Sequence, residues 1–389
     1  MDRSYDVIVL GLGAMGSAAA YQLAKRGARV LGLDRFAPPH DAGSTHGDTR
    51  LTRQAIGEGL AYTPLALRSN QIWREVERQT GQELYVQTGG LILSGADDSA
   101  IHGKPGFLQT TLAAAREYDI PHEVLAPEEV RRRFPPFRVR GDEVGYYEPG
   151  AGYLRPERCV AAQLGLAQDL EADLHVNERV LGFEPAGDGV RVQTDRGRYE
   201  AGRLIVSAGP WAAELLGDAL RGLFRVYRQV LYWYDVAARY EEFLPGRFPV
   251  FIWGLGGGED VYGFPALDGR GGGIKVAAEE YLAETTPESV VRVVSPEEKG
   301  AMYAGRVGPY LEGVTGECLR AVCCLYTVTP DFGFVIDTLP GLPQVILASP
   351  CSGHGFKHSA AIGEVLADLA TVGESRLDVS SFRLGRFPI

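Results

Sequence analysis

The sequence has few of the features that mark metal-binding, disulfide-stabilised or membrane proteins. Its 389 residues include only five cysteines, which show no paired spacing and form no C-x-x-C motif. No disulfide framework is therefore expected, and without an H-E-x-x-H motif no metal site is predicted. No apolar run reaches the roughly 18–20 residues that span a bilayer. The first residues lack the basic and apolar segments of a signal peptide, so we expect a cytoplasmic protein with no membrane partner.

An excess of positive charge is also missing. The chain has 39 lysine and arginine residues against 50 aspartate and glutamate residues, which gives a formal net charge of −11. Nucleic acids bind basic faces, so no nucleic acid partner is expected. Hydrophobic residues make up 45% and charged residues 23% of the chain, which is typical of a globular protein. The length allows two domains, or one large domain with insertions.

The stretch from Tyr5 to Asp34 predicts a β-α-β unit that binds a dinucleotide. An apolar strand leads into Gly11-Leu-Gly13-Ala-Met-Gly16, a helix of small residues follows, and a second apolar strand ends at Asp34. Gly11 permits a tight turn, Gly13 lets the backbone approach a pyrophosphate, and Gly16 lets the helix pack close to the strand. The helix N-terminus offers free N–H groups to phosphates. Asp34 lies eighteen residues after Gly16 and suits a ribose hydroxyl, but the motif does not separate NAD from FAD.

A polar stretch follows the second strand. Residues 43–53 combine glycines and hydroxyl side chains with His46, Arg50 and Arg53. If this segment is helical, the i, i+3 spacing puts the two arginines on one face. Their position directly after a nucleotide unit favours a functional site over an ordinary solvated face. For His46, a purely structural role stays open.

The rest of the chain predicts an α/β fold with an insertion. Helical patterns cover residues 17–26, 65–79, 108–118, 127–134, 155–169 and 360–371. Residues 217–310 are rich in aromatic and strand-forming residues, and α/β character returns near residue 345. We therefore expect a Rossmann-like nucleotide-binding domain with an inserted, mostly antiparallel β (α+β) substrate domain. The predicted boundaries assign residues 1–85, 145–216 and 325–389 to the first domain and residues 86–144 and 217–324 to the second.

Six further segments carry a family resemblance. They are His46-Gly-Asp-Thr-Arg50-Leu-Thr-Arg53, Gly57-Glu58-Gly59, Tyr262-Gly-Phe-Pro265, Cys324-Leu-Tyr326-Thr, Phe334-Val-Ile-Asp-Thr-Leu-Pro340 and Ser352-Gly-His-Gly-Phe-Lys357. In order, and over nearly the whole chain, they resemble the monomeric sarcosine oxidase and N-methyltryptophan oxidase family. The resemblance implies FAD as the cofactor of the dinucleotide unit. It also implies oxidation of the C–N bond of N-methyl amino acids, with O₂ reduced to hydrogen peroxide.

The resemblance further implies where the cofactor is held. Cys324 matches the residue that carries the flavin through a covalent 8α-S-cysteinyl bond. Neighbouring residues of a strand point to opposite faces, so only one of Cys323 and Cys324 can reach the flavin. Cys323 stays open as the alternative tether. The other predicted cofactor contacts are Gly11, Gly13, Ala14, Met15, Gly16, Asp34, Arg35, Thr49, Val180, Gly209, Gly353 and Gly355.

The substrate site is also implied by the resemblance. Arg53 and Lys357 match the two cations that bind the substrate carboxylate, and the arginine fork suits that group. Lys275 matches the lysine beside which O₂ is reduced, where positive charge stabilises a developing anion. The other pocket residues implied are His46, Arg50, Glu58, Tyr262 and Tyr326.

Three features depart from the family pattern, and all three border the expected pocket. Glu279 stands four residues after Lys275, where the family usually has histidine, and Gln54 replaces the histidine after Arg53. The loop between Pro265 and Lys275 is longer and contains three consecutive glycines. Glu279 is therefore predicted to contact the substrate, where a carboxylate would favour a cationic amine or change the reach of the pocket.

We expect a monomer that acts on a small amino acid and O₂. Three alternatives stay open at this point: an oxidase of a cyclic secondary amino acid such as pipecolate or proline, a flavin dehydrogenase with another electron acceptor, and a flavin-binding subunit without turnover. The retained Arg53 and Lys357 argue against the last of these. An NAD dehydrogenase is disfavoured because nothing after residue 40 resembles a nicotinamide site.

Overall fold

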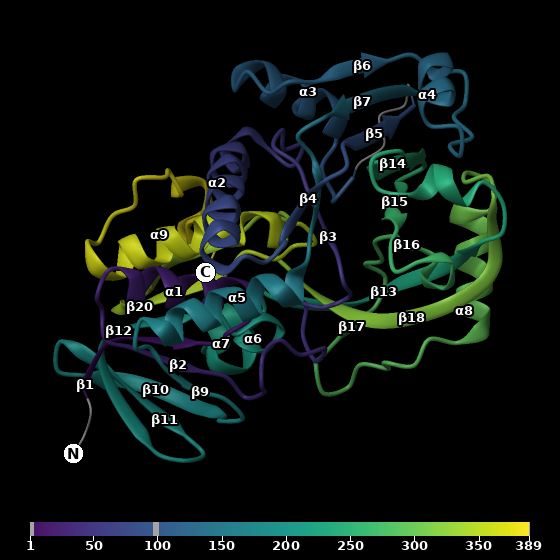
Figure 1. The fold of residues 1–389 in the computed structure, drawn as a ribbon. Helices are drawn as coiled ribbons and strands as arrows, with labels where there is room; N and C mark the ends of the chain where they lie inside the picture. Colours follow the sequence, from purple (N-terminus) through teal and green to yellow (C-terminus); the bar gives the residue numbers. More distant parts are fainter. Residues whose placement is uncertain (1–3, 96–100, 389) are drawn as a thin grey trace.

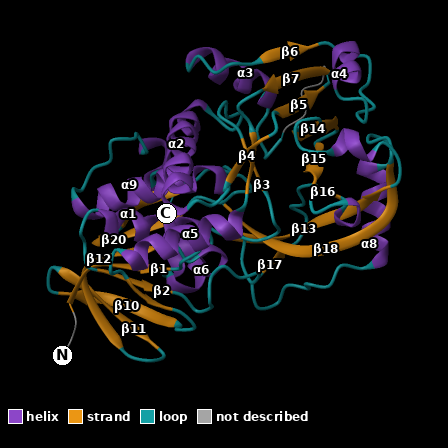
Figure 2. Ribbon diagram, in the orientation of Figure 1, coloured by secondary structure: helices purple, strands orange, loops and turns teal. Residues whose placement is uncertain are grey.

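The computed structural model describes residues 4–95 and 101–388, which form two large β-sheets joined by a small one (Figure 1). The first sheet contains the N-terminal strand and is flanked by most of the long helices. The second sheet carries the long strands that curve along the other side of the molecule (Figure 2). Both sheets take strands from distant parts of the sequence, so neither is built from one continuous segment.

The first sheet has a parallel centre and an antiparallel edge. Its parallel strands are β1 (Ser4–Leu10), β2 (Val30–Leu33), β9 (Asp173–His175), β12 (Arg198–Val206) and β20 (Leu342–Ser349). The antiparallel strands are β10 (Val180–Ala186), β11 (Gly189–Thr194) and β19 (Val335–Leu339). Strand β1 lies between β2 and β12, so the glycine-rich turn that follows it opens at the carboxyl edge of the parallel strands.

Both faces of the first sheet are buried. Val7 and Val9 pack on the helical side, while Ile8 and Leu10 belong to a separate core on the opposite side. This alternation follows from the two-residue period of a strand and explains why the predicted strand reads as a continuous apolar run. The opposite core is closed by α6 (Ala212–Leu215), α7 (Asp218–Arg221) and the antiparallel edge.

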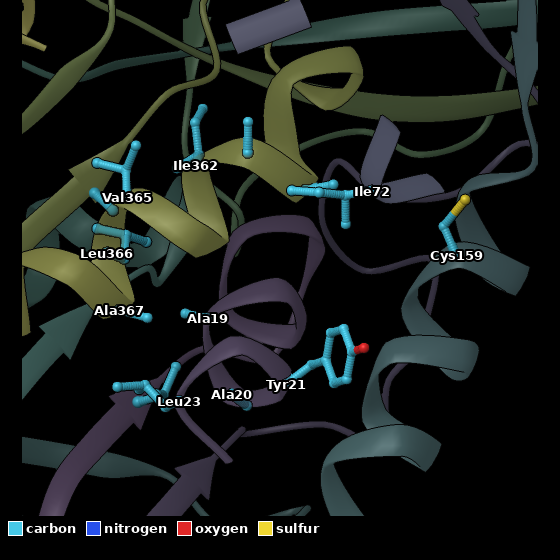
Figure 3. Close-up of a cluster of buried hydrophobic side chains, with 14 of the residues drawn as sticks. Ala19, Ala20, Tyr21, Leu23, Ile72, Cys159, Ile362, Val365, Leu366 and Ala367 are labelled. Atoms are coloured by element: carbon cyan, nitrogen blue, oxygen red, sulfur yellow. The ribbon is translucent and has the colours of Figure 1, made fainter. Parts of the chain in front are cut away.

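Four helices cover the other face: α1 (Ala14–Lys25), α2 (Thr63–Thr80), α5 (Pro156–Asp169) and α9 (Ser359–Thr371). Figure 3 shows α1 beside α9, with Ala19 and Leu23 of α1 near Val365 and Leu366 of α9. The close approach depends on small side chains. A Cβ atom on Gly363 would lie 2.4 Å from Ala18 Cβ, so only glycine fits there.

The second sheet is mostly antiparallel and has nine strands. They are β5 (Gly90–Ser94), β6 (Glu123–Leu125), β7 (Val144–Glu148), β13 (Arg225–Val236), β14 (Val250–Gly256), β15 (Glu259–Ala266), β16 (Ile274–Ala277), β17 (Glu284–Thr285) and β18 (Val314–Val328). Three further helices belong to this half: α3 (Phe107–Glu117), α4 (Pro127–Arg133) and α8 (Pro296–Met302). Its core is aromatic, with the Phe137 and Phe248 rings stacked at 4.8 Å.

A three-stranded sheet of β3 (Arg50–Thr52), β4 (Tyr85–Gln87) and β8 (Gly152–Leu154) links the two halves. The condition for a shared arginine face is not met, because Arg50 begins strand β3 and Arg53 directly follows that strand. Arg50 pairs with Leu154 and Thr52 pairs with Gly152, so residues at i and i+3 lie on opposite sides of β3. The two arginines consequently serve different parts of the site.

All six predicted helices are present, with ends that differ by at most three residues. Strands β7 and β18 run across two of the predicted domain boundaries, near residues 145 and 325. The division into two discontinuous domains stays a prediction. Among the described residues, no helix combines the length and apolar character needed to cross a membrane.

Replacing Gly363 with alanine should destabilise the protein. The added methyl group would also lie 2.5 Å from the Ala18 carbonyl carbon, which cannot move without shifting α1. We expect the free energy of unfolding to fall by about 1–3 kcal/mol, the usual cost of overpacking. Denaturant unfolding measures this change. Gly165→Ala is the matched control, because nothing lies within 4 Å of its added Cβ in helix α5. Equal effects of the two substitutions would contradict the packing argument.

Candidate active site

The predicted glycine turn has the geometry that a dinucleotide requires. Gly11 has a φ of 85° and its N–H donates to the Leu33 carbonyl oxygen at 2.8 Å, which ties the turn to β2. A Cβ on Gly16 would lie 1.7 Å from the Gly11 carbonyl oxygen, so the helix packs against the turn as expected. At Gly13 the nearest atom to such a Cβ is Thr45 Oγ1 at 3.6 Å. The backbone at Gly13 is therefore open to a ligand.

Asp34 ends β2 and is buried. Its carboxylate accepts hydrogen bonds from the backbone N–H groups of Leu12 and Phe36, both at 2.8 Å. Burial raises the pKa of Asp34, and the two N–H donors oppose that shift. These bonds fix the carboxylate beside the glycine turn, where it can accept from a ribose hydroxyl.

A long cavity, called here the dinucleotide cavity, runs from Asp34 past the glycine turn to Tyr326. Ten of the predicted cofactor contacts line it: Gly11, Gly13, Ala14, Met15, Asp34, Arg35, Val180, Gly209, Gly353 and Gly355. Gly16 lies in the first turn of α1, packed against Gly11, and Thr49 lines a neighbouring cavity. The open backbone at the turn, the helix N-terminus and the Asp34 carboxylate together fit an extended dinucleotide such as FAD.

A second cavity, called here the inner pocket, adjoins the first. Arg50, Tyr326, Gly353 and Phe356 line both cavities, so they mark the boundary between them. Lys275 and Tyr262 from the second sheet, and Lys357 from the turn before α9, complete much of the wall. The Tyr262 and Tyr326 hydroxyls lie 3.2 Å apart. Residues predicted separately from distant segments therefore meet in one pocket.

Lys275 is fully enclosed at the edge of the inner pocket. Its Nζ donates to the carbonyl oxygens of Gly47 and Thr49, both at 2.7 Å, and to Thr49 Oγ1 at 3.1 Å. Burial, followed by the charge of Arg50, holds the pKa of Lys275 well below its usual value. Three acceptors thus hold the lysine nitrogen in place.

Arg50 lines both cavities, and Cys324 lies directly behind it, outside the lining of either cavity. Arg50 Nη2 donates to the Ser44 carbonyl oxygen at 2.7 Å and lies 3.6 Å from Cys324 Sγ. Cys324 is buried on the inner face of β18. Cys323 lies on the other face, where burial raises the pKa of its thiol and the charge of Arg228 opposes that shift. His46 lies nearby, and burial together with Arg50 lowers its pKa to about 4. His46 is therefore a neutral ring.

The predicted carboxylate-binding cations share a carboxylate of the protein itself. Glu58 Oε2 is ion-paired with Arg53 Nη2, and Glu58 Oε1 accepts from Lys357 Nζ at 3.3 Å. All three side chains are buried. Burial opposes ionisation of Glu58, but Arg53 and Lys357 hold its pKa well below the usual value. Burial lowers the pKa of Lys357 to about 8, although Glu58 opposes this.

Sequence reasoning missed several pocket residues. His102 and Asp260 line the inner pocket, and Ser44, Ser207 and Trp211 line the dinucleotide cavity. His102 follows no recognisable motif, and its position depends on the fold of the second sheet. Glu279, predicted as a substrate contact, lies behind the wall of the pocket with its carboxylate 2.5 Å from His102 Nδ1. Of these missed residues, only Trp211 could have been identified from the sequence, because it follows a buried strand that ends in a glycine at residues 203–209.

Comparison with known proteins agrees with this geometry. The family model described as FAD dependent oxidoreductase matches residues 6–369. A monomeric sarcosine oxidase from Streptomyces avermitilis is 44% identical over 383 residues, covering 98% of this chain and 97% of the relative. An N-methyl-L-tryptophan oxidase from Yersinia pestis is 37% identical over 389 residues, covering 98% and 99%.

A solved structure shares the architecture over the same extent. The open form of NikD, described as an unusual amino acid oxidase essential for nikkomycin biosynthesis, is similar with a TM-score of 0.81 and 26% identity. The match covers 98% of this chain and 97% of that one. The predicted fold class and the family resemblance are both confirmed. With a dinucleotide cavity built as the motif requires and relatives matched along their full length, the chain belongs to the FAD dependent oxidoreductase family.

Proposed function

We propose that this protein is an FAD-dependent oxidase of N-methyl amino acids. The reaction converts the C–N single bond of the substrate into an imine while O₂ becomes hydrogen peroxide, and water then hydrolyses the imine to an aldehyde and an amine. The carrying observation is the pair of buried cations, Arg53 and Lys357, which converge on Glu58, with Lys357 in the wall of the inner pocket and Arg53 behind that wall. The monomeric sarcosine oxidase and N-methyl-L-tryptophan oxidase relatives support this substrate class.

The substrate carboxylate takes over contacts that Glu58 makes in the free protein. Arg53 and Lys357 converge on Glu58, so their donors already point at a carboxylate. A buried guanidinium and ammonium bind such a group strongly because little water screens them. The face of the Phe107 ring lies 4.9 Å from Arg53 Cζ and keeps the guanidinium oriented.

The opposite end of the substrate lies between the tyrosine pair and the cofactor. When bound, FAD supplies the two-electron acceptor for the substrate C–H bond. Burial raises the pKa values of Tyr262 and Tyr326 above their usual range, so both hydroxyls stay protonated. They orient the substrate and exclude water. An amine that binds in the neutral form needs no side chain as a base.

Lys275 and Arg50 support the reduction of O₂. A fixed positive charge stabilises negative charge that develops on oxygen, and it does so best in a pocket without water. Lys275 meets this requirement because three acceptors hold its ammonium in the wall of the inner pocket. Cys324 is the proposed covalent tether, since its sulfur lies 3.6 Å from Arg50 at the end of the dinucleotide cavity.

The substrate class is tested by mixing the oxidised enzyme with candidate substrates in the absence of O₂. We expect sarcosine or a larger N-methyl amino acid to bleach the flavin absorbance, and O₂ to restore it with peroxide formed. Lys357→Met should raise the KM about tenfold or more while flavin content is retained, because one charged carboxylate contact is lost. Lys25→Met, on the exposed face of α1, is the control. If only pipecolate or proline bleaches the flavin, the substrates are cyclic secondary amino acids and the proposed substrate class is wrong.

Cys324→Ala should release the flavin from the polypeptide. We expect acid precipitation to give a yellow pellet with the unchanged protein and a colourless pellet with a yellow supernatant for the variant. Cys323→Ala is the matched control, since it removes a neighbouring thiol on the opposite face of β18. A pellet that stays yellow with Cys324→Ala would assign the tether elsewhere.

Lys275→Met should slow reoxidation by O₂ about 100-fold or more, in the range found when a group that stabilises an oxyanion is removed. Flavin reduction by substrate should change much less. In the unchanged protein, the protonated lysine is the active form. The reoxidation rate should therefore fall as pH rises through a pKa below the ordinary 10.5 of lysine. Stopped-flow absorbance measures both half-reactions, and a reoxidation rate that is independent of residue 275 would exclude the assigned role.

A further inference from the structure

Glu279 is a buried carboxylate that the carboxylate-binding cations do not neutralise. The Tyr281 hydroxyl donates to its Oε2 at 2.7 Å, and its Oε1 lies 2.5 Å from His102 Nδ1. Glu279 contacts the turn that lines both cavities, because a Cβ on Gly353 would lie 2.7 Å from its Oε1. A buried carboxylate is stable only with a cation beside it. Among the described residues, His102 is the ion-pair partner of Glu279.

His102 faces a carboxylate with each of its ring nitrogens. Its Nδ1 lies beside Glu279, and its Nε2 is 3.8 Å from Glu58 Oε1. Two acceptors on opposite sides of one imidazole are satisfied only when both nitrogens carry protons. Burial opposes that charge, but Glu279 and then Glu58 raise the pKa of His102. The ring therefore lies between two carboxylates that both favour its charged form.

The other histidine beside Glu58 cannot serve this purpose. His354 Nδ1 lies 3.7 Å from Glu58 Oε1, but His354 Nε2 lies 3.1 Å from the Phe332 carbonyl oxygen. Burial holds the pKa of His354 well below its usual value, so the ring is neutral. Its single proton is on Nε2, where it meets the carbonyl, and the Nδ1 that faces Glu58 is an acceptor. His102 is left as the histidine that can carry positive charge beside Glu58.

Substrate binding changes the charge balance around His102. The groups that face it are Glu58 from the loop before α2, Glu279 after β16, Asp260 on β15, and Lys357 and His354 from the turn before α9. A substrate carboxylate adds a negative charge and competes with Glu58 for Arg53 and Lys357. Glu58 must then keep another cation beside it or take up a proton. Burial, followed by the charge of Glu279, already raises the pKa of Asp260 to about 7, so the pocket tolerates little further negative charge.

We propose that His102 is a positioning residue: as an imidazolium it bridges Glu58 and Glu279, and it retains Glu58 when the carboxylate of an amino acid substrate binds Arg53 and Lys357. This inference rests on the proposed carboxylate site. It gives a role to Glu279, the residue at which this chain departs from the family pattern. The pair of His102 and Glu279 sets the charge of the pocket, so carboxylate affinity depends on the protonation of His102.

The test measures binding without turnover. Pyrrole-2-carboxylate has no oxidisable C–H bond beside an amine, and its binding to the flavin-loaded protein is followed by absorbance between pH 6 and 9. We expect affinity in the unchanged protein to fall with rising pH in two steps, one at His102 and one near pH 8 at Lys357. His102→Gln should lower affinity about tenfold at pH 7, as for loss of a charge-assisted hydrogen bond. It should remove the first step and keep the second.

Two further variants separate charge from structure. Glu279→Gln removes the main group that raises the pKa of His102, so the first step should move to lower pH while the second stays. His102→Lys keeps a cation and should bind more tightly than His102→Gln, without the first step. His122→Gln is the matched control, because His122 stacks on Tyr146 away from the inner pocket, and its binding curve should be unchanged. Flavin content and the thermal midpoint establish that each variant is folded.

The outcomes distinguish this inference from the proposed function. If His102→Gln binds the carboxylate with the affinity and pH profile of the unchanged protein, the role of His102 is overturned and the carboxylate site stands. If Glu279→Gln leaves the first step in place, the bridge between the two residues is overturned. If the unchanged protein binds no carboxylate at any pH, the carboxylate site and this inference both fail.

Discussion

Glu58 is the buried charge around which the two ends of the chain meet. It is paired with Arg53 just after β3 and with Lys357 almost 300 residues later. Neither cation could be buried beside the other without this carboxylate, because like charges in a dry site repel strongly. The ion triad therefore orders the inner pocket in the absence of substrate. In the proposed function, the same two cations receive a second carboxylate, which is the group that an amino acid brings.

The position of this triad explains why the two sheets must be joined as they are. Arg53 follows a strand of the small central sheet, and Lys357 follows the last parallel strand of the first sheet. Lys275 and Tyr262 come from the second sheet. Each element supplies one or two side chains, and no single segment carries the chemistry. The dinucleotide turn fixes the cofactor end of the same cavity system, so binding and chemistry are held by different parts of one scaffold.

The sequence predicted what depends on short-range patterns. Gly11, Gly13 and Gly16 were identifiable because one turn needs all three, and six helices followed from their apolar period. Strand β3 itself was not predictable, because three residues are too few to show the two-residue period of a strand. Arg53, Lys275 and Lys357 could be named only through the family resemblance. The His102–Glu279 pair could not be found at all, because partners 177 positions apart leave no local signal.

The last parallel strand and the last helix have a consequence for how the protein is made. Strand β20 pairs with β12 beside β1, and α9 packs on α1. The first thirty residues thus emerge from the ribosome long before the segment that covers them, which ends at Thr371. Until α9 has been synthesised, the apolar surface of α1 lacks its native neighbour. The nucleotide-binding half therefore completes its folding only after this segment has been translated, and contacts of such long range make that step slow.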